Sequence, residues 1–276
     1  MEAQELTSPQ NPKIKYLTKL RKRSFRDEEQ IFLIEGYREC LRAMQSGWPI
    51  QDFFYCKDLW LGENEPELIE AAKESGARLY DCSEKVFRKV AYRDRPDGLI
   101  ALAPQLHLGL ENLETGENPF YLLLVGIEKP GNLGTMLRSA DAAGVDAVIL
   151  CDAVTDIYNP NTVRASVGTL FSVPVIESTF EECGSWLLEQ GIPLLAMTPH
   201  ADRSLYQSNL QGPVAVAVGS EMLGLSDHWL ERAEMKVSLP MEGLADSLNV
   251  STAAAITLYE VLRQRGPRSP SMEIEA

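Results

Sequence analysis

The sequence predicts an α/β protein built from two units, and three observations lead to this prediction. Short apolar runs alternate with amphipathic segments along most of the 276 residues. The runs in the second half, such as "FYLLLV" and "VAVAV", are apolar at every position, which is typical of parallel strands covered on both faces. A polar, acidic stretch, "PQLHLGLENLETGEN", lies between the halves and predicts a linker.

The first half reads as a unit of ordinary domain size. Leu17, Leu20 and Phe25 are spaced as on one helix, which we expect over residues 16–30. The following segments alternate, with strands expected at 31–36, 50–56, 77–82 and 97–103 and helices at 37–47, 65–76 and 83–92. Ser83 stands where the last helix needs an N-cap.

The second half repeats a strand–helix alternation that predicts a doubly wound parallel sheet. Strands are expected at 120–126, 146–151, 193–198, 214–219 and 236–240. Helices are expected at 132–144, 159–171, 181–191 and 226–234, with a last one that opens near Ser247. We expect the tail, residues 266–276, to be flexible.

Composition excludes several classes of protein. No apolar run reaches about 18 residues, so no membrane span is expected. The five cysteines are dispersed, which predicts reduced thiols in a cytoplasmic protein, and no metal-binding spacing is present. The net charge of −14 is unexpected for a protein that binds nucleic acid, but residues 13–26, "KIKYLTKLRKRSFR", are strongly basic. By itself this run is explained equally well as a solvated helix face.

A dinucleotide-binding oxidoreductase is the first alternative for such a sheet. It needs G-x-G-x-x-G after the first strand, whereas Gly126, Gly131 and Gly134 have the wrong spacing. This spacing disfavours that enzyme class.

Three polar segments instead follow strands whose carboxyl ends should meet at one edge of the sheet. The first, "NLGTMLRSADAAG", offers Asn132 as an N-cap and Arg138 in the second turn of its helix. The second, "GSEMLGLSD", contains Gly219 and Glu221, and the third opens at Ser247 with "SLNVSTAAAITLYE". Each residue alone is explained by capping or solvation. Together the segments predict a ligand site.

These three segments resemble the sequence motifs of the SpoU class of RNA ribose methyltransferases, also called the TrmH family, within the SPOUT superfamily. The resemblance covers residues 119–265 in the family's order and implies a parallel sheet with a deep trefoil knot. Residues 1–105 resemble the family's ribosomal-protein-like substrate-binding domain, with Asp97 in "RPDG" where Gln is more common, and residues 106–118 would be the linker.

The resemblance implies transfer of a methyl group from S-adenosylmethionine to a ribose 2′-hydroxyl of RNA by a homodimer. The separate first domain favours ribosomal RNA as the substrate. A transfer RNA enzyme remains an alternative, as does a non-catalytic RNA-binding or ribosome-assembly protein on the same fold. Neither a metal nor a membrane is implied.

The resemblance also implies roles for residues. Arg138 would activate the 2′-hydroxyl or, because a guanidinium is a poor base and a good phosphate ligand, hold a phosphate. The residues that would arrange nucleotide and cofactor around it are Asn132, Glu221, Ser247 and Asn249. S-adenosylmethionine would contact Thr198, Gly219, Leu239, Leu248 and Asn249, and a bulky residue at Gly219 should abolish its binding without unfolding the protein. RNA phosphates would contact Lys19, Arg21, Lys22, Arg23, Arg26 and Arg164, and Tyr16 or Phe25 could stack on an unpaired base.

Overall fold

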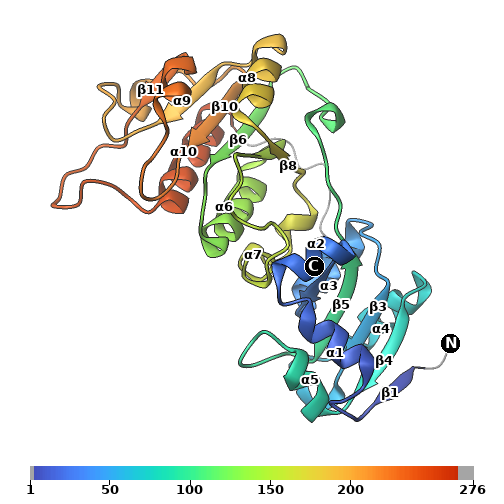
Figure 1. Cartoon of the computed structure of the whole chain (residues 1–276). Coiled ribbons are helices and arrows are strands. Elements are labelled where there is room, and N and C mark those ends of the chain that lie inside the picture. The colour runs from blue at the N-terminus through green and yellow to red at the C-terminus, as the bar shows by residue number, and fades with distance from the viewer. Residues whose placement is uncertain (1–2, 267–276) are drawn as a thin grey trace. The chain divides into compact units, whose positions relative to one another are not determined.

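A computed structural model describes residues 3–266 (Figure 1), so the predicted tail beyond Gly266 lies outside the described residues. The chain divides into two compact units. Unit 1 contains the first half up to His107 together with residues 133–135 and 156–172, and unit 2 contains the remaining described residues. No helix of this described part has both the length and the apolar character needed to cross a membrane.

Unit 1 is built on a mixed five-stranded sheet with the order β1-β4-β3-β5-β2. Its strands are β1 (Gln4–Leu6), β2 (Ile31–Glu35), β3 (Asp52–Tyr55), β4 (Arg78–Cys82) and β5 (Leu99–Pro104). β5 runs antiparallel to both of its neighbours, β2 and β3. The helices are α1 (Pro12–Lys19), α2 (Arg23–Glu29), α3 (Tyr37–Gln45), α4 (Glu65–Glu74), α5 (Glu84–Val90) and α7 (Pro160–Ser166), with 3₁₀ turns η1 (Lys57–Leu59) and η3 (Thr169–Phe171).

The single helix expected over residues 16–30 is wrong, because α1 and α2 are separated by residues 20–22. α1 also begins earlier, since the Asn11 side chain accepts a hydrogen bond from the Lys13 N–H and Pro12 occupies the first turn. The break lets the Leu20 carbonyl accept a hydrogen bond from the buried Arg26 guanidinium (2.7 Å). Both Leu20 and Arg26 thereby reach the interior of unit 1.

Residues 156–172 are part of unit 1 although they lie far along the chain. Phe32 of β2 packs against Tyr158 with ring centroids 4.5 Å apart, and Trp48 packs edge-on against Phe171 at 5.2 Å. The Arg42 guanidinium donates to the Val167 carbonyl (2.5 Å). The core of unit 1 therefore includes side chains that the first half alone does not supply.

Unit 2 is built on a six-stranded sheet with the order β11-β9-β10-β6-β7-β8, parallel throughout. Its strands are β6 (Phe120–Val125), β7 (Ala147–Cys151), β8 (Val175–Ser178), β9 (Leu194–Met197), β10 (Val214–Val218) and β11 (Met235–Val237). The helices are α6 (Pro130–Ala143), α8 (Phe180–Glu189), α9 (Asp227–Arg232) and α10 (Val250–Arg265), with 3₁₀ turns η2 (Leu110–Asn112) and η4 (Leu205–Gln207). The α/β fold with a parallel sheet is confirmed, while the trefoil threading stays a prediction.

The central strands of unit 2 are buried on both faces, as their apolar sequences predict. One face packs with Cys183 and Leu187 of α8 and with Trp229 of α9. α10 packs against β10, and its buried apolar positions are Ala254, Leu258 and Val261. Because the strands are parallel, all the segments that follow them begin at the same edge of the sheet.

Candidate active site

Four neighbouring strands of unit 2, β11, β9, β10 and β6, deliver polar segments to this edge. β6 leads into α6, β10 into the segment with Gly219 and Glu221, and β11 into the long connection that ends at Asn249. The edge thus collects all three segments that the sequence analysis singled out.

A chain of hydrogen bonds joins one side chain from each of these segments. The Asn132 amide donates to a carboxylate oxygen of Glu221, and the Asn249 amide nitrogen lies 3.4 Å from Asn132 Oδ1. The other carboxylate oxygen of Glu221 is buried without a hydrogen-bond partner among residues 3–266. A buried, half-satisfied carboxylate is costly unless a ligand donates to it, so this chain of side chains is poised to receive a donor.

The expected N-caps are half right. Asn249 caps α10, because its Oδ1 accepts hydrogen bonds from the Ser251 N–H (2.9 Å) and hydroxyl (2.6 Å). Asn132 is not a cap: α6 begins two residues earlier at Pro130, whose fixed φ suits the first helical position. This places Asn132 inside the first turn, free to reach Glu221, and Arg138 in the third turn rather than the second.

An open pocket lies beside this chain of side chains, with an empty volume of about 430 Å³ that includes its mouth. Four of the residues predicted for the site line this pocket, namely Thr198, Leu239, Ser247 and Leu248. The remaining lining residues are Met197, Pro199, Met241, Asp246 and Ala253. Met197 and Pro199 flank Thr198 at the end of β9, and nothing in their sequence context marked them as site residues.

Gly219 is not among the residues that line this pocket, and the structure gives a steric reason for a glycine at this position. A Cβ at Gly219 would lie 2.0 Å from the Gly224 carbonyl carbon and 2.3 Å from the Leu225 nitrogen. The close approach that requires glycine is therefore made by the chain's own backbone, which folds back so that Ser220 and Gly224 form a β-bridge. A bulky residue here would displace the segment that carries Glu221, so we expect the loss of cofactor binding to come with a local change in the backbone.

Arg138 is exposed on α6, and its guanidinium makes no hydrogen bond or ion pair within the described part of the chain. It shares a helix with Asn132 but is not joined to the Asn132–Glu221–Asn249 chain. Its role in catalysis stays a prediction.

The basic segment of unit 1 is not uniformly available to RNA. Arg26 is only 1% exposed and forms an ion pair with Asp156, so its assignment to RNA is wrong. A guanidinium so enclosed cannot reach a phosphate without leaving Asp156 unpaired. Tyr16 and Phe25 are partly buried against the core and pack edge-on against each other, and their stacking on a base stays a prediction.

Lys13 is half-buried and forms an ion pair with Asp52 (2.6 Å). The remaining basic residues of the segment are exposed, namely Lys15, Lys19, Arg21, Lys22 and Arg23. Arg21 reaches across to the end of α5, where its guanidinium donates to the Val90 and Ala91 carbonyls (3.2 and 2.5 Å). Lys19 lies 5.4 Å from the centre of the Phe25 ring, and Arg23 pairs with Asp27 at 3.5 Å. Arg164 is exposed on α7 and donates to Asn161 (3.2 Å).

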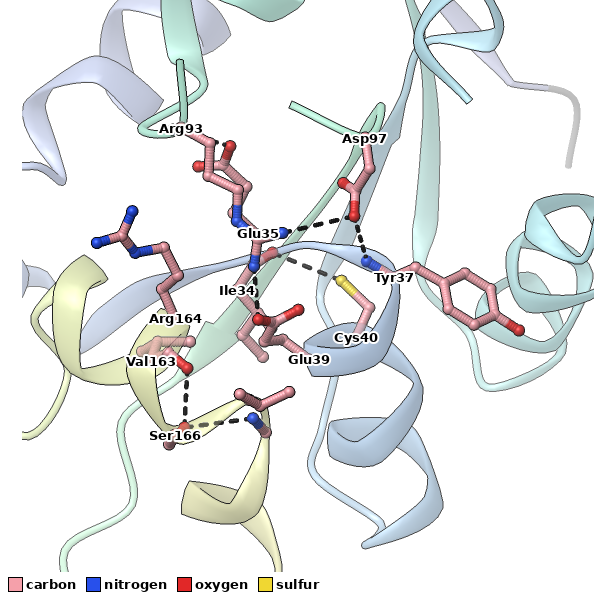
Figure 2. A network of polar contacts seen from close by, with 12 residues as sticks. Ile34, Glu35, Tyr37, Glu39, Cys40, Arg93, Asp97, Val163, Arg164 and Ser166 are labelled. Carbon is pink, nitrogen blue, oxygen red and sulfur yellow. Dashed lines mark hydrogen bonds and ion pairs between the residues drawn. The ribbon is translucent and has the colours of Figure 1, made fainter. Parts of the chain in front are cut away.

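Unit 1 also contains an acidic network around Arg93 (Figure 2). The Arg93 guanidinium contacts Glu39 (2.5 Å) and Asp97 (3.6 Å), and Asp97 accepts the Tyr37 N–H (2.9 Å). Burial raises the pKa of Glu39 above its ordinary value, opposed by the charge of Arg93. Asp97 thus anchors the start of α3 and the Arg93 side chain.

Comparisons with known proteins agree with this geometry. Residues 119–259 match the SpoU rRNA Methylase family, and residues 11–101 match the MRM3-like substrate binding domain. The chain is 31% identical over 258 residues to the 23S rRNA (guanosine(2553)-2′-O)-methyltransferase RlmP of Bacillus subtilis (strain 168), covering 93% of this chain and 98% of that relative.

Solved structures give the same picture. An RNA 2′-O ribose methyltransferase is 43% identical with a TM-score of 0.83, covering 95% of this chain and 99% of the other. The AdoMet-bound rRNA methyltransferase from Sinorhizobium meliloti is 29% identical with a TM-score of 0.87, covering 95% and 98%. With the motifs, the sheet and these matches in agreement, the chain belongs to the SpoU rRNA methylase family.

Proposed function

We propose that this protein transfers a methyl group from S-adenosylmethionine to a ribose 2′-hydroxyl of ribosomal RNA. The observation that carries the proposal is the Asn132–Glu221–Asn249 chain of hydrogen bonds beside a pocket at the carboxyl edge of the sheet. The relative RlmP, which matches 93% of this chain, is named a 23S rRNA (guanosine(2553)-2′-O)-methyltransferase.

The residues of the pocket fit S-adenosylmethionine. Met197, Leu239, Met241 and Leu248 offer apolar walls for a planar base, and the Ser247 hydroxyl offers a polar contact. Asp246 adds a carboxylate, which suits the positive charges of that cofactor. When bound, the cofactor supplies an activated methyl group on its sulfonium.

The chain's own groups then need to position the ribose and take up a proton. Glu221 is suited to accept a hydrogen bond from a hydroxyl, because one of its oxygens is held by Asn132 and the other has no partner among the described residues. Asn249 couples this pair to the start of α10 and to the neighbouring pocket residue Leu248. Arg138, exposed and uncommitted within residues 3–266, is suited to hold a phosphate of the target nucleotide.

The test is transfer of labelled methyl groups from S-adenosylmethionine to ribosomal RNA, followed by mapping of the methylated ribose. Arg138→Ala should lower turnover by roughly 10²-fold or more while calorimetric affinity for the cofactor stays unchanged. Label in transfer RNA but not in ribosomal RNA would show that transfer RNA, and not ribosomal RNA, is the substrate. RNA binding with no transfer would favour the non-catalytic alternative.

We also propose that the protein acts as a homodimer in the cytoplasm. Unit 2 exposes several large apolar side chains that a second copy could cover, namely Met222 (82%), Leu223 (87%), Leu244 (107%) and Tyr259 (51%). The five cysteines are free and buried, as in a reducing compartment. A monomeric mass by light scattering from a fully active preparation would contradict the dimer.

A further inference from the structure

The positive charge of unit 1 is concentrated in two stretches of sequence. Residues 11–26 and 84–95 together contain 12 Lys and Arg but only two acidic residues. The rest of the first 107 residues contains five basic and 16 acidic residues. The second stretch forms α5 and the segment after it, and it contains both of these acidic residues, Glu84 and Asp94.

The structure places these two stretches side by side. α1 and α5 are in contact, and both bury apolar residues in the same core. The Arg21 guanidinium donates to carbonyls at the end of α5, and the Lys89 amine donates to the Pro9 carbonyl just before α1 (2.7 Å). The two basic stretches therefore form one surface of unit 1.

The outer face of α5 is basic along its length. Val86, Phe87 and Val90 are buried, whereas Lys85, Arg88 and Lys89 are exposed at the i, i+3 and i+4 spacing of one helical stripe. Arg88 pairs with Glu84 (2.7 Å), the acidic residue of the helix's first turn. Side chains in this arrangement match the repeated negative charges of a nucleic-acid backbone.

An aromatic side chain stands at the end of this stripe. Tyr92 is 41% exposed, and its backbone is fixed because the Glu35 carboxylate accepts the Tyr92 and Arg93 N–H groups (2.6 and 3.1 Å). Glu35 is thereby satisfied within the protein. A phenol ring on a fixed backbone is a low-entropy platform for stacking on a base.

The same surface continues to α7. Arg21, Tyr92 and Arg164 border a single opening, which also has Val90 and Pro160 on its walls. In the close-up, Arg164 extends away from α7 on the side where Arg93 and Glu35 lie (Figure 2). Three segments of the chain thus contribute cations around Tyr92.

We propose that the exposed face of α5 and Tyr92 form the part of the RNA-binding surface that holds an unpaired stretch of the substrate. Phosphates lie along Lys85, Arg88 and Lys89, and one base stacks on Tyr92. This inference rests on the proposed function and assigns its substrate contacts to residues outside the segment 13–26 that the sequence singled out.

The first experiment measures the salt dependence of binding to a 23S ribosomal RNA transcript. Replacing Lys85, Arg88 and Lys89 with Gln should lower the slope of log affinity against log salt by about 2 and weaken binding at least roughly tenfold. The matched control replaces three exposed lysines elsewhere, Lys57, Lys73 and Lys236, with Gln. Because both sets remove three charges, equal losses in the two proteins would overturn the proposal.

The second experiment tests stacking with a 12-nucleotide single-stranded RNA that has 2-aminopurine at its centre. The wild-type protein should change the probe's fluorescence on binding, Tyr92→Phe should preserve that change, and Tyr92→Ala should remove it with a several-fold loss of affinity. A Tyr92→Ala protein that behaves like wild type would overturn the role of Tyr92.

The experiments distinguish an error in the proposed RNA-binding surface from an error in the proposed enzymatic activity. If the wild-type protein methylates ribosomal RNA but the Lys85/Arg88/Lys89 variant binds with an unchanged salt slope, the surface is wrong and the enzyme stands. If the slope falls as expected but no methyl group is transferred, the surface stands and the proposed activity fails.

Discussion

The two units differ most in how they carry charge. Residues 1–107, which make up most of unit 1, have 17 basic and 18 acidic residues, a net charge of −1. The rest of the chain has nine basic and 22 acidic residues, a net charge of −13. Nearly all of the net negative charge that argues against a nucleic-acid partner therefore lies outside residues 1–107, which form most of the unit proposed to bind RNA.

This contrast shows that the net charge of a whole chain is a poor guide to its partners. Unit 1 is close to neutral, yet its basic residues are gathered on α1, α5 and the segments beside them. Most of unit 2 lies in the strongly acidic rest of the chain, so we expect phosphates to be held there only beside exposed cations such as Arg138. RNA should thus be bound mainly by one unit and methylated by the other.

The largest expected effect tests the tight backbone of unit 2. Gly219→Ala should abolish measurable cofactor binding, because the added Cβ would overlap the Gly224 backbone and displace the segment that carries Glu221. Gly243→Ala is the control, since a Cβ there meets open space. Calorimetry with S-adenosylmethionine measures the effect, and wild-type affinity in Gly219→Ala would show that the contact is relaxed at no cost.

The next effect concerns the stability of unit 1. Arg26→Met should lower the free energy of unfolding by about 3–5 kcal/mol, because it leaves Asp156 as a largely buried, unpaired charge. Arg26→Met combined with Asp156→Leu should recover much of this loss. Arg23→Met, at an exposed site, should change stability by less than about 0.5 kcal/mol.

Urea denaturation measures the free energy of unfolding of each of these variants. A loss below about 1 kcal/mol in Arg26→Met would mean that water reaches Asp156 and that the ion pair does not hold residues 156–172 in unit 1.

The smallest effect separates two roles of one residue in unit 2. Asn249→Ala should lower stability by about 1 kcal/mol through loss of the α10 cap, and Asn249→Ser should restore most of it. Serine is too short to reach Asn132 as the asparagine amide does. Methyl transfer should therefore stay low in both variants, and full activity in Asn249→Ser would restrict Asn249 to capping.

The sequence predicted most strands and helices because their apolar periodicity is local. β1 and β8 were missed, and both are short strands at a sheet edge with little apolar pattern of their own. The break between α1 and α2 was missed because it depends on Arg26 turning inward to the Leu20 carbonyl. That contact in turn depends on Asp156, which is 130 residues away.

The candidate site was also predicted only in part, because the sequence shows local motifs but not the contacts between distant segments. Motifs identified Asn132, Glu221 and Asn249, and the structure joins them. Met197 and Pro199 were missed, since an apolar residue at the end of a buried strand looks the same whether or not a pocket lies beside it. The steric need for Gly219 also could not be read from the sequence, because it comes from the return of the chain at Gly224.

The membership of residues 156–172 in unit 1 has a consequence for synthesis of the protein. At about 5–20 residues per second, several seconds separate the synthesis of His107 from that of Ser172. Throughout that interval Phe32 and Trp48 lack the aromatic partners Tyr158 and Phe171, and Arg26 lacks Asp156. The first unit to leave the ribosome can therefore be completed only after much of the second unit's sequence has followed it.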